Sequence, residues 1–249
     1  MSVAVMLPTY CEAENIESLI HEIQELKLDL TITVIDDSSP DGTADVVKNL
    51  QKKYGNIHLV SRPEKLGLGT AITTGFRYML KLRKIPDYIV TMDADYSHNP
   101  RDIPRLVDVA KKGCDLVIGS RYVQEGKVIG SSLRRRVISR LANVVAAITV
   151  GSRLHDCTSG FRCYSRRYVK DVLPSLHSQT YEIQIETVKQ ARLTGFKIEE
   201  IPITFMNRKH GKSKLTAIES RAFITYIFKA ILGNLLLLWK RVARAKIAN

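Results

Sequence analysis

Residues 88–95 read Tyr-Ile-Val-Thr-Met-Asp-Ala-Asp, an apolar run that ends in two carboxylates separated by one residue. The run predicts a buried β-strand, and open α/β sheets place their ligands at the carboxyl ends of such strands. Two carboxylates in that position can hold one hard cation, directly or through its waters, against a phosphate group. An isolated Asp-x-Asp pattern is more commonly a solvated turn, so the rest of the chain has to support the metal site.

Apolar and amphipathic segments alternate on the N-terminal side of this run. Strands are predicted at 3–7, 31–35 and 57–60, and helices at 14–26, 43–53 and 68–82. The alternation predicts a parallel sheet with right-handed crossovers and helices on both faces. Gly67 and Gly69 would allow a close backbone approach at the start of the third helix.

The pattern is less regular after residue 95. Strands are predicted at 116–119 and 161–164, helices at 133–150 and 181–193, and an edge strand at 196–205 that Pro202 interrupts. With 249 residues and 45% hydrophobic content, the chain can bury one full α/β core.

The N-terminal sequence and the cysteines indicate the cellular compartment of the protein. The N-terminus lacks the basic region of a secretory signal and meets Pro8 early, so we expect the body of the protein to lie in the cytoplasm. The four cysteines show no zinc-ligand spacing, which indicates unpaired thiols in a reducing environment.

A formal net charge of +13 predicts attraction to polyanions, which could be nucleic acid, anionic lipid or phosphorylated small molecules. The basic residues adjoin apolar stretches and lack interleaved aromatic side chains, which favours a membrane surface and disfavours nucleic acid. In the helix predicted at 133–150, arginines flank an apolar stripe made of Leu133, Val137, Leu141, Val144, Val145 and Ile148. We expect this helix at a lipid headgroup boundary; the alternative is a core-facing stripe with a solvated basic side.

The segment 222–239 is apolar but contains Lys229 and Asn234, and its uninterrupted part is shorter than the ~20 residues of a comfortable membrane span. We expect an interfacial or docked helix. A short transmembrane helix and a helix packed on the rest of the protein are the alternatives. Trp239, followed by Lys240 and Arg241, suits a membrane boundary.

Five segments occur in an order that resembles the family-two glycosyltransferases of the GT-A fold. They are residues 7–15, 36–43, 93–95, 119–122 and 159–162. The resemblance covers nearly the whole chain and is closest to the dolichol-phosphate mannose synthases. It implies an α/β fold with a mostly parallel, Rossmann-like sheet flanked by helices, a catalytic domain over 1–214, and a membrane-associated C-terminal helical segment over 215–249.

The activity that this resemblance implies is that of a dolichyl-phosphate β-D-mannosyltransferase. Such an enzyme transfers mannose from GDP-mannose to dolichyl or polyprenyl phosphate with inversion, and uses Mg²⁺ or Mn²⁺. The second pKa of a phosphate monoester is about 6, so the acceptor is mostly a dianion at neutral pH and needs no catalytic base. Two alternatives stay open: transfer of glucose or an N-acetylhexosamine from another nucleotide sugar, and a non-catalytic polyanion- or membrane-binding subunit.

The resemblance also implies roles for individual residues. Nucleotide-sugar binding falls to Pro8, Tyr10, Glu12, Asp37, Asp93, Ala94, Asp95, Arg121, Arg208 and Lys214. Metal binding falls to Asp93 and Asp95, catalysis to Asp95 and Arg121, and binding of the acceptor phosphate to Arg121, Arg135 and Ser139. Arg121 could grip phosphate oxygens with two parallel hydrogen bonds. Asp36 would orient its turn and His98 would be structural.

Two departures from the family pattern concern this site. Ser97 stands where relatives often carry Gln, which puts the contact of that longer side chain in doubt. The basic loop over 207–215 resembles a mobile lid that includes Arg208, Ser213 and Lys214, but His210 and Lys212 differ from the usual residues. The implied partners are a membrane surface and possible membrane-anchoring subunits, with the catalytic domain on the cytoplasmic face, of the endoplasmic reticulum in a eukaryote.

Overall fold

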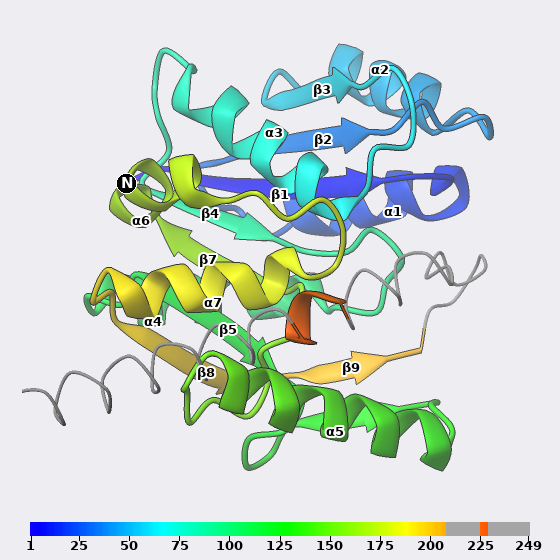
Figure 1. The fold of residues 1–249 in the computed structure, drawn as a ribbon. Helices are drawn as coiled ribbons and strands as arrows, with labels where there is room; N and C mark the ends of the chain where they lie inside the picture. The colour runs from blue at the N-terminus through cyan, green and yellow to red at the C-terminus, as the bar shows by residue number, and fades with distance from the viewer. Residues whose placement is uncertain (208–224, 229–249) are drawn as a thin grey trace, which may run out of the picture.

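A computed structural model describes residues 1–207 and 225–228 of the chain (Figure 1). Within these residues the main sheet has seven strands in the order β3-β2-β1-β4-β7-β5-β8. Their bounds are β1 Val3–Thr9, β2 Leu30–Asp36, β3 Ile57–Ser61, β4 Tyr88–Thr91, β5 Leu116–Ser120, β7 Arg162–Ser165 and β8 Ile198–Pro202. Strand β7 runs antiparallel to both of its neighbours, and the other pairs are parallel. The predicted mostly parallel α/β sheet is confirmed.

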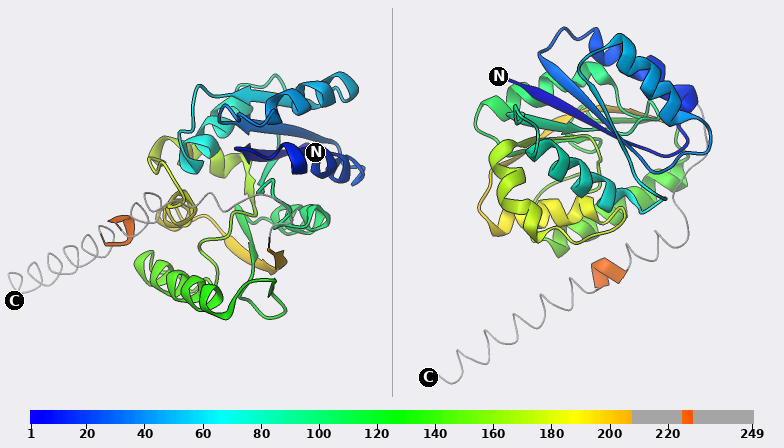
Figure 2. Two further views of the ribbon diagram at one scale, coloured as in Figure 1. Left: turned by 90° about the vertical axis from the view of Figure 1, so that its right-hand side faces the viewer. Right: turned by 90° about the horizontal axis from the view of Figure 1, so that it is seen from above.

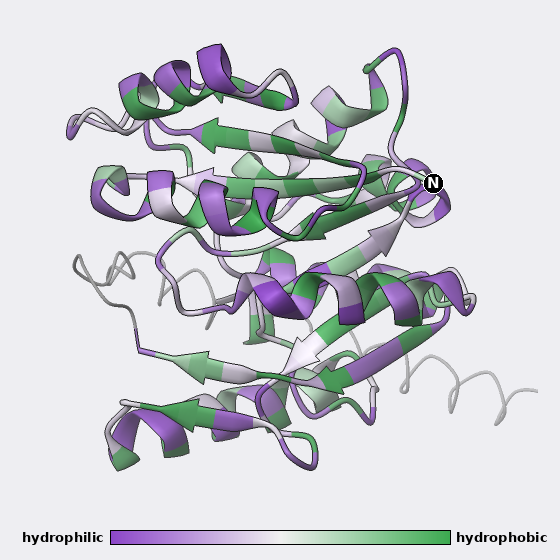
Figure 3. Cartoon of the chain, turned by 180° about the vertical axis from the view of Figure 1, so that it is seen from behind, coloured by the Kyte–Doolittle hydropathy of each residue, from purple (hydrophilic) through white to green (hydrophobic). Residues whose placement is uncertain are grey.

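Helices cover both faces of this sheet, as the view from above in Figure 2 shows. One face is covered by α1 (Ala13–Gln24), α2 (Thr43–Lys53) and α4 (Ile103–Lys111), and the other by α3 (Leu68–Leu80), α6 (Arg166–Val172) and α7 (Ile183–Leu193). Successive side chains of a strand point to opposite faces. Thus Val3, Val5 and Leu7 of β1 enter the first core, and Ala4 and Met6 enter the second. The strands are largely hydrophobic in Figure 3, whereas the helices carry both kinds of residue.

The third helix begins where the backbone of another loop comes unusually close. A Cβ atom at Gly67 would lie 2.6 Å from the carbonyl oxygen of Gln179, and one at Gly69 would lie 2.2 Å from that of Ser178. The amides of Gly69 and Thr70 both donate to Gln179 O, at 2.8 and 3.2 Å. The close approach predicted from the two glycines is confirmed, and it ties the start of α3 to the loop before α7.

Several elements differ from the sequence-based expectation. Helices α4 and α6 and the short strand β6 (Lys127–Ile129) were not predicted. The edge strand expected over 196–205 is two strands: β8 forms the edge of the main sheet, and β9 (Thr204–Met206) pairs with β6 in a separate two-stranded sheet. Pro202 has no backbone N–H and therefore ends the pairing of β8, after which the chain passes to the second sheet.

Helix α5 (Leu133–Thr149) lies at the border of the molecule with its apolar stripe turned outward. The side chains of Leu133, Leu141 and Ile148 are 70%, 60% and 70% exposed. The helix buries small and polar residues instead, namely Asn143, Ala146, Ala147 and Thr149. The alternative of a core-facing stripe is therefore wrong, because the packing surface of α5 is the side opposite to its large apolar residues.

Candidate active site

A cleft of about 770 Å³ lies at the carboxyl ends of β1, β2, β4 and β5. Strands β2 and β4 flank β1 on opposite sides, so the cleft lies at the point where the strand order reverses, the usual ligand position in such sheets. Every predicted site residue within the described part of the chain lines this cleft: Pro8, Tyr10, Glu12, Asp37, Asp93, Ala94, Asp95, Arg121, Arg135 and Ser139. Arg208, Ser213 and Lys214 lie outside the described residues, as does the segment 229–249.

The carboxylate pair follows β4 at the floor of the cleft. Asp95 is buried and its Oδ1 accepts a hydrogen bond from the amide of Ser97 at 3.0 Å, whereas the side chain of Asp93 is 43% exposed. A Cβ atom at Gly160 would lie 3.2 Å from Asp93 Oδ1, so glycine there leaves space beside this carboxylate.

These residues offer a divalent ion oxygen ligands. Among the residues that the structure describes, no group of three or more His, Cys, Asp or Glu side chains could hold a metal. An ion at the cleft floor would therefore take the two carboxylates and complete its shell with substrate or water oxygens, which suits Mg²⁺ or Mn²⁺. The buried Ser97 Oγ also lines the cleft and has no hydrogen-bond partner in the described residues.

His98 contacts the backbone of the loop that contains Asp93 and Asp95. Its Nδ1 accepts the amide proton of Asp93 at 3.2 Å, and its ring stacks on Phe161 with 5.0 Å between ring centroids. Burial lowers the pKa of His98 to about 4, with the nearby Asp95 carboxylate opposing the shift. The imidazole is therefore neutral at pH 7 with its Nδ1 lone pair engaged, which agrees with a structural role.

Asp37 directly follows β2 and lines the cleft beside a buried arginine, Arg62, that was not predicted. Arg62 Nε donates to Asp37 Oδ1 at 2.6 Å, and the amide of Leu66 donates to Oδ2 at 3.2 Å. Burial raises the pKa of Asp37, although Arg62 acts in the other direction. Arg62 directly follows β3, whose parallel pairing with β2 could have indicated that the two side chains meet at one sheet edge.

Asp36 orients its turn, as expected from the sequence. A second basic residue, Lys65, also lines the cleft. Asp36 accepts from Thr9 Oγ1 at 3.1 Å and from the amide of Ser39 at 3.0 Å, so it holds the turn. Lys65 Nζ lies 5.4 Å from the ring centroid of Tyr10, and both residues line the cleft. A cation above an aromatic ring at this end would attract a negatively charged group.

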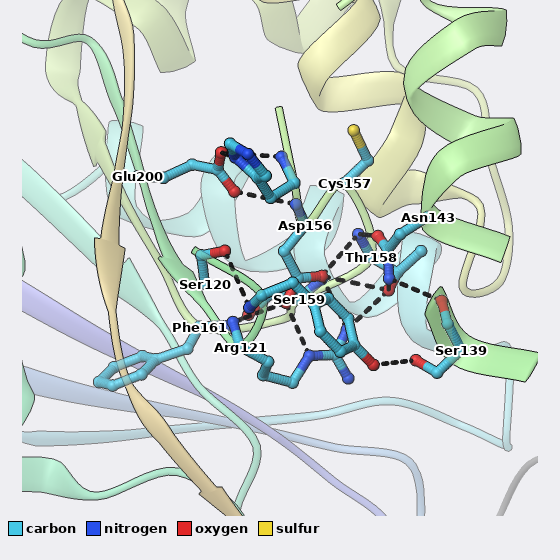
Figure 4. A network of polar contacts seen from close by, with 12 residues as sticks. Ser120, Arg121, Ser139, Asn143, Asp156, Cys157, Thr158, Ser159, Phe161 and Glu200 are labelled. Carbon is cyan, nitrogen blue, oxygen red and sulfur yellow. Dashed lines mark hydrogen bonds and ion pairs between the residues drawn. The ribbon is translucent and has the colours of Figure 1, made fainter. Parts of the chain in front are cut away.

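Arg121 follows β5 and is held by a buried carboxylate that was not predicted, Asp156 (Figure 4). Its Nε and Nη2 each donate to Asp156 at 2.7 Å, and Nη2 also donates to Thr158 Oγ1 at 2.7 Å. Burial alone would raise the pKa of Asp156, but the charge and hydrogen bonds of Arg121 outweigh it and lower the pKa. The pair therefore stays charged.

This geometry restricts the predicted phosphate contact of Arg121. The Nε–Nη2 edge of the guanidinium, which could form two parallel bonds to a phosphate, already faces Asp156. A phosphate in the cleft would have to meet Nη1, which has no hydrogen-bond partner among the described residues. Asp156 stands just before the 159–162 segment, and this proximity was the available signal for it.

A polar network connects α5 to this ion pair, as Figure 4 shows. Asn143 Nδ2 donates to Thr158 Oγ1 and the amide of Thr158 donates back to Asn143 Oδ1, both at 3.0 Å. Tyr122 Oη donates to Ser139 Oγ at 2.7 Å. The network fixes the register of α5 against the loop that carries Asp156.

The residues that line the cleft become more apolar toward α5. Its α5 side is formed by Arg135 and Ser139, which are four residues apart on one helix face, together with the apolar Ile138, Leu141 and Val145. A ligand that spans the cleft would meet carboxylates at one end, arginines near the middle and an apolar surface at the other. No helix within residues 1–207 and 225–228 has the length and apolar character needed to cross a bilayer.

The family model described as Glycosyl transferase family 2 matches residues 4–173. Polyprenol monophosphomannose synthase of Mycolicibacterium smegmatis is 37% identical over 219 residues, which are 87% of this chain and 82% of the relative. Undecaprenyl-phosphate mannosyltransferase of Micrococcus luteus is 37% identical over 218 residues, 87% of this chain and 88% of the relative.

Solved structures share the fold at low identity. Glucosyl-3-phosphoglycerate synthase from Mycobacterium tuberculosis, in complex with Mn²⁺, uridine diphosphate and phosphoglyceric acid, has a TM-score of 0.64 at 22% identity and covers 93% of this chain and 78% of its own. A mannosyltransferase from Pyrobaculum calidifontis, in complex with GDP-Man and Mn²⁺, has a TM-score of 0.58 at 18% identity over 85% of this chain and 58% of its own. The fold of this chain is that of the GT-A glycosyltransferases.

Proposed function

The chain belongs to glycosyl transferase family 2, and on this premise we propose that it transfers mannose from GDP-mannose to a polyprenyl phosphate. The names of two 37% identical relatives support the sugar and the acceptor, and a distant structural neighbour holds GDP-Man. The observation that carries the proposal is the single cleft in which a carboxylate pair and an arginine-flanked apolar helix face meet. A water-soluble sugar nucleotide and a lipid phosphate need these two surfaces side by side.

The donor would lie over the carboxyl ends of β1, β2 and β4. Tyr10, Pro8, Glu12 and Asp37 would line the nucleotide end, and Lys65 would offset phosphate charge there. Asp93 and Asp95 would hold the divalent ion, which when bound supplies positive charge to the departing diphosphate. His98 would keep the Asp93 backbone in place through the amide contact to Nδ1.

The acceptor phosphate would lie between Arg121 Nη1, Arg135 and Ser139, all on the cleft wall. These groups would offset the repulsion between two anionic substrates and align a phosphate oxygen with the anomeric carbon of mannose. The bond from that oxygen to the anomeric carbon forms as the bond from the carbon to the GDP oxygen breaks. A single displacement of this kind inverts the anomeric configuration and needs no protein nucleophile.

The outward face of α5 would rest on the membrane that contains the acceptor. Large apolar side chains and arginines on one exposed helix suit the headgroup boundary of an anionic bilayer. We propose a membrane-associated protein with its catalytic domain, over 1–214, on the cytoplasmic face. The proposed C-terminal membrane segment over 215–249 lies almost wholly outside the described residues.

Transfer assays with purified full-length protein test the chemistry. Radiolabelled GDP-mannose, UDP-glucose and UDP-N-acetylglucosamine are offered in parallel with a polyprenyl phosphate in detergent and Mn²⁺, and only GDP-mannose should label the lipid. Asp95→Ala should abolish transfer, whereas Asp108→Ala, which removes an exposed carboxylate paired with Lys111 on α4, should not. Transfer that persists in Asp95→Ala would contradict the metal site, and labelling from another nucleotide would change the assigned donor.

Vesicle flotation tests the membrane face. The double variant Val144→Glu and Ile148→Glu changes residues that are 56% and 70% exposed and do not line the cleft. It should reduce binding to vesicles of phosphatidylglycerol severalfold and leave the unfolding midpoint unchanged. Lys52→Glu on α2 alters net charge by the same amount at the opposite end of the molecule and serves as the control. Equal flotation of the two variants would show that α5 is not the docking face.

A further inference from the structure

Tyr122 lies between Arg121, Arg140 and Ser139, on the α5 side of the cleft. It follows Arg121 at the end of β5, is half-buried and lines the cleft. Its hydroxyl donates to Ser139 Oγ at 2.7 Å. The guanidinium carbons of Arg121 and Arg140 lie 5.2 and 5.7 Å from the centre of its ring. One side chain thus contacts Arg121 and Ser139, which border the proposed phosphate position, as well as Arg140, which does not line the cleft.

The hydrogen bond determines what Ser139 can do. A hydroxyl has one proton to donate and two lone pairs to accept with, and Tyr122 occupies one lone pair. A serine within a helix often donates its proton to the carbonyl four residues earlier, but Ser139 Oγ forms no such bond among the described residues. Its proton therefore remains available on the cleft side, where Ser139 contributes to the wall.

Donation by Tyr122 also strengthens the donor that it contacts. In a chain of hydrogen bonds each member polarises the next, by roughly 10–30% per bond in condensed phases. A phenol is a stronger donor than an alkyl hydroxyl, so the chain runs from Tyr122 through Ser139 toward an anion in the cleft. The same bond holds Ser139 Oγ in one rotamer, which removes a rotational freedom that phosphate binding would otherwise have to restrict.

We infer that Tyr122 is a positioning residue for the acceptor phosphate, which acts through Ser139 by fixing its hydroxyl as a donor. This inference rests on the proposed function, because it requires a lipid phosphate on the α5 side of the cleft. The guanidinium groups of Arg121 and Arg140 contact the aromatic ring of Tyr122, whereas only its hydroxyl contacts Ser139. Removal of that hydroxyl should therefore weaken phosphate binding only while Ser139 is present.

Equilibrium binding tests this dependence without any sugar nucleotide. Farnesyl phosphate is titrated into the full-length protein by calorimetry in detergent, with farnesol as the probe that lacks phosphate. Tyr122→Phe should weaken farnesyl phosphate binding about three- to tenfold, the range of one uncharged hydrogen bond, and leave farnesol binding unchanged. Ser139→Ala should weaken it to a similar or greater degree. In the Ser139→Ala background, Tyr122→Phe should add less than about twofold.

A matched variant separates positioning from general structural damage. Tyr54→Phe removes a hydroxyl that lies 2.8 Å from His21 Nδ1 and does not line the cleft, and it should leave farnesyl phosphate binding unchanged. Independent effects of Tyr122→Phe and Ser139→Ala would overturn the inference, because Tyr122 would then contact the phosphate itself. Equal weakening of farnesol and farnesyl phosphate would overturn it too, as would a wild-type protein that binds neither. Binding that follows the expected pattern in a protein without mannosyl transfer would support the inference and count against the proposed function alone.

Discussion

Asp156→Asn should destabilise the protein by about 3–5 kcal/mol, although the substitution preserves the shape of the side chain. The buried carboxylate accepts from Arg121 N, Nε and Nη2, and from the loop donors at Thr158 and Ser159. An amide can replace only one oxygen as an acceptor, and its NH₂ group would face two donors of Arg121. The loss of two hydrogen bonds to a charged group, at about 1.5–3 kcal/mol each, accounts for the expected magnitude.

Urea unfolding followed by circular dichroism measures this effect. For a chain of this size, about 3–5 kcal/mol corresponds to a melting point lower by roughly 6–20 °C. Asp45→Asn is the matched control: it breaks an ion pair with Lys48 whose partners are 76% and 58% exposed, and its unfolding midpoint should stay close to that of the wild type. Equal midpoints for the two variants would refute the assignment of Asp156 as the buried anchor of Arg121.

The effect should also depend on pH. The pKa of Asp156 lies below its ordinary value of 3.8, because Arg121 outweighs the cost of burial. A carboxyl whose folded pKa is lowered stabilises the protein above the unfolded pKa, and this contribution is lost as pH falls through the folded pKa. The difference in free energy of unfolding between wild type and Asp156→Asn should therefore stay constant from about pH 7 to 5 and decrease below about pH 4. A difference in free energy of unfolding that increases on acidification would contradict a lowered pKa of Asp156.

Two further predictions concern the thiols and the start of α3. Ellman's reagent should titrate Cys11 first in the native protein, because the other three cysteines are buried. GDP should slow that reaction, because Cys11 lies between Tyr10 and Glu12, which line the proposed nucleotide end of the cleft. A second fast thiol, or no protection by GDP, would contradict this prediction. Gly69→Ala should cost about 2–4 kcal/mol in urea unfolding, because its Cβ would lie 2.2 Å from Ser178 O. Gly55→Ala, whose Cβ would meet nothing within 4 Å, should stay within about 1 kcal/mol, and similar midpoints for both would refute the steric argument.

The first half of the fold could be predicted from the sequence because its strands are short apolar runs that alternate with amphipathic helices. Parallel strands end at the same sheet edge, so the residues that follow β1, β2 and β4 had to meet. That reasoning places Asp37 and the Asp93–Asp95 pair in one cleft, where the structure has them. Their roles in binding remain predictions.

What could not be predicted depends on pairings between distant segments. Asp156 and Arg121 are separated by 35 residues, and nothing in local spacing shows that β7 inserts antiparallel between β4 and β5 and so brings them together. Periodicity identified the apolar stripe of α5 but could not say which side of the helix packs. The side that packs is the one with Asn143, whose amide group is hydrogen-bonded to Thr158, and with the small, buried Ala146 and Ala147.

The large apolar residues of α5 lie on the side opposite to its packing surface, so packing and surface properties depend on different residues of one helix. Its inward residues pack against the rest of the protein, and its outward residues remain available for the proposed membrane contact. Substitutions at outward positions that do not line the cleft, such as Val144 and Ile148, should therefore change the free energy of unfolding little. The same freedom offers a practical route to detergent-free preparations, since polar replacements at the most exposed of these positions would improve colloidal behaviour without disturbing the interior.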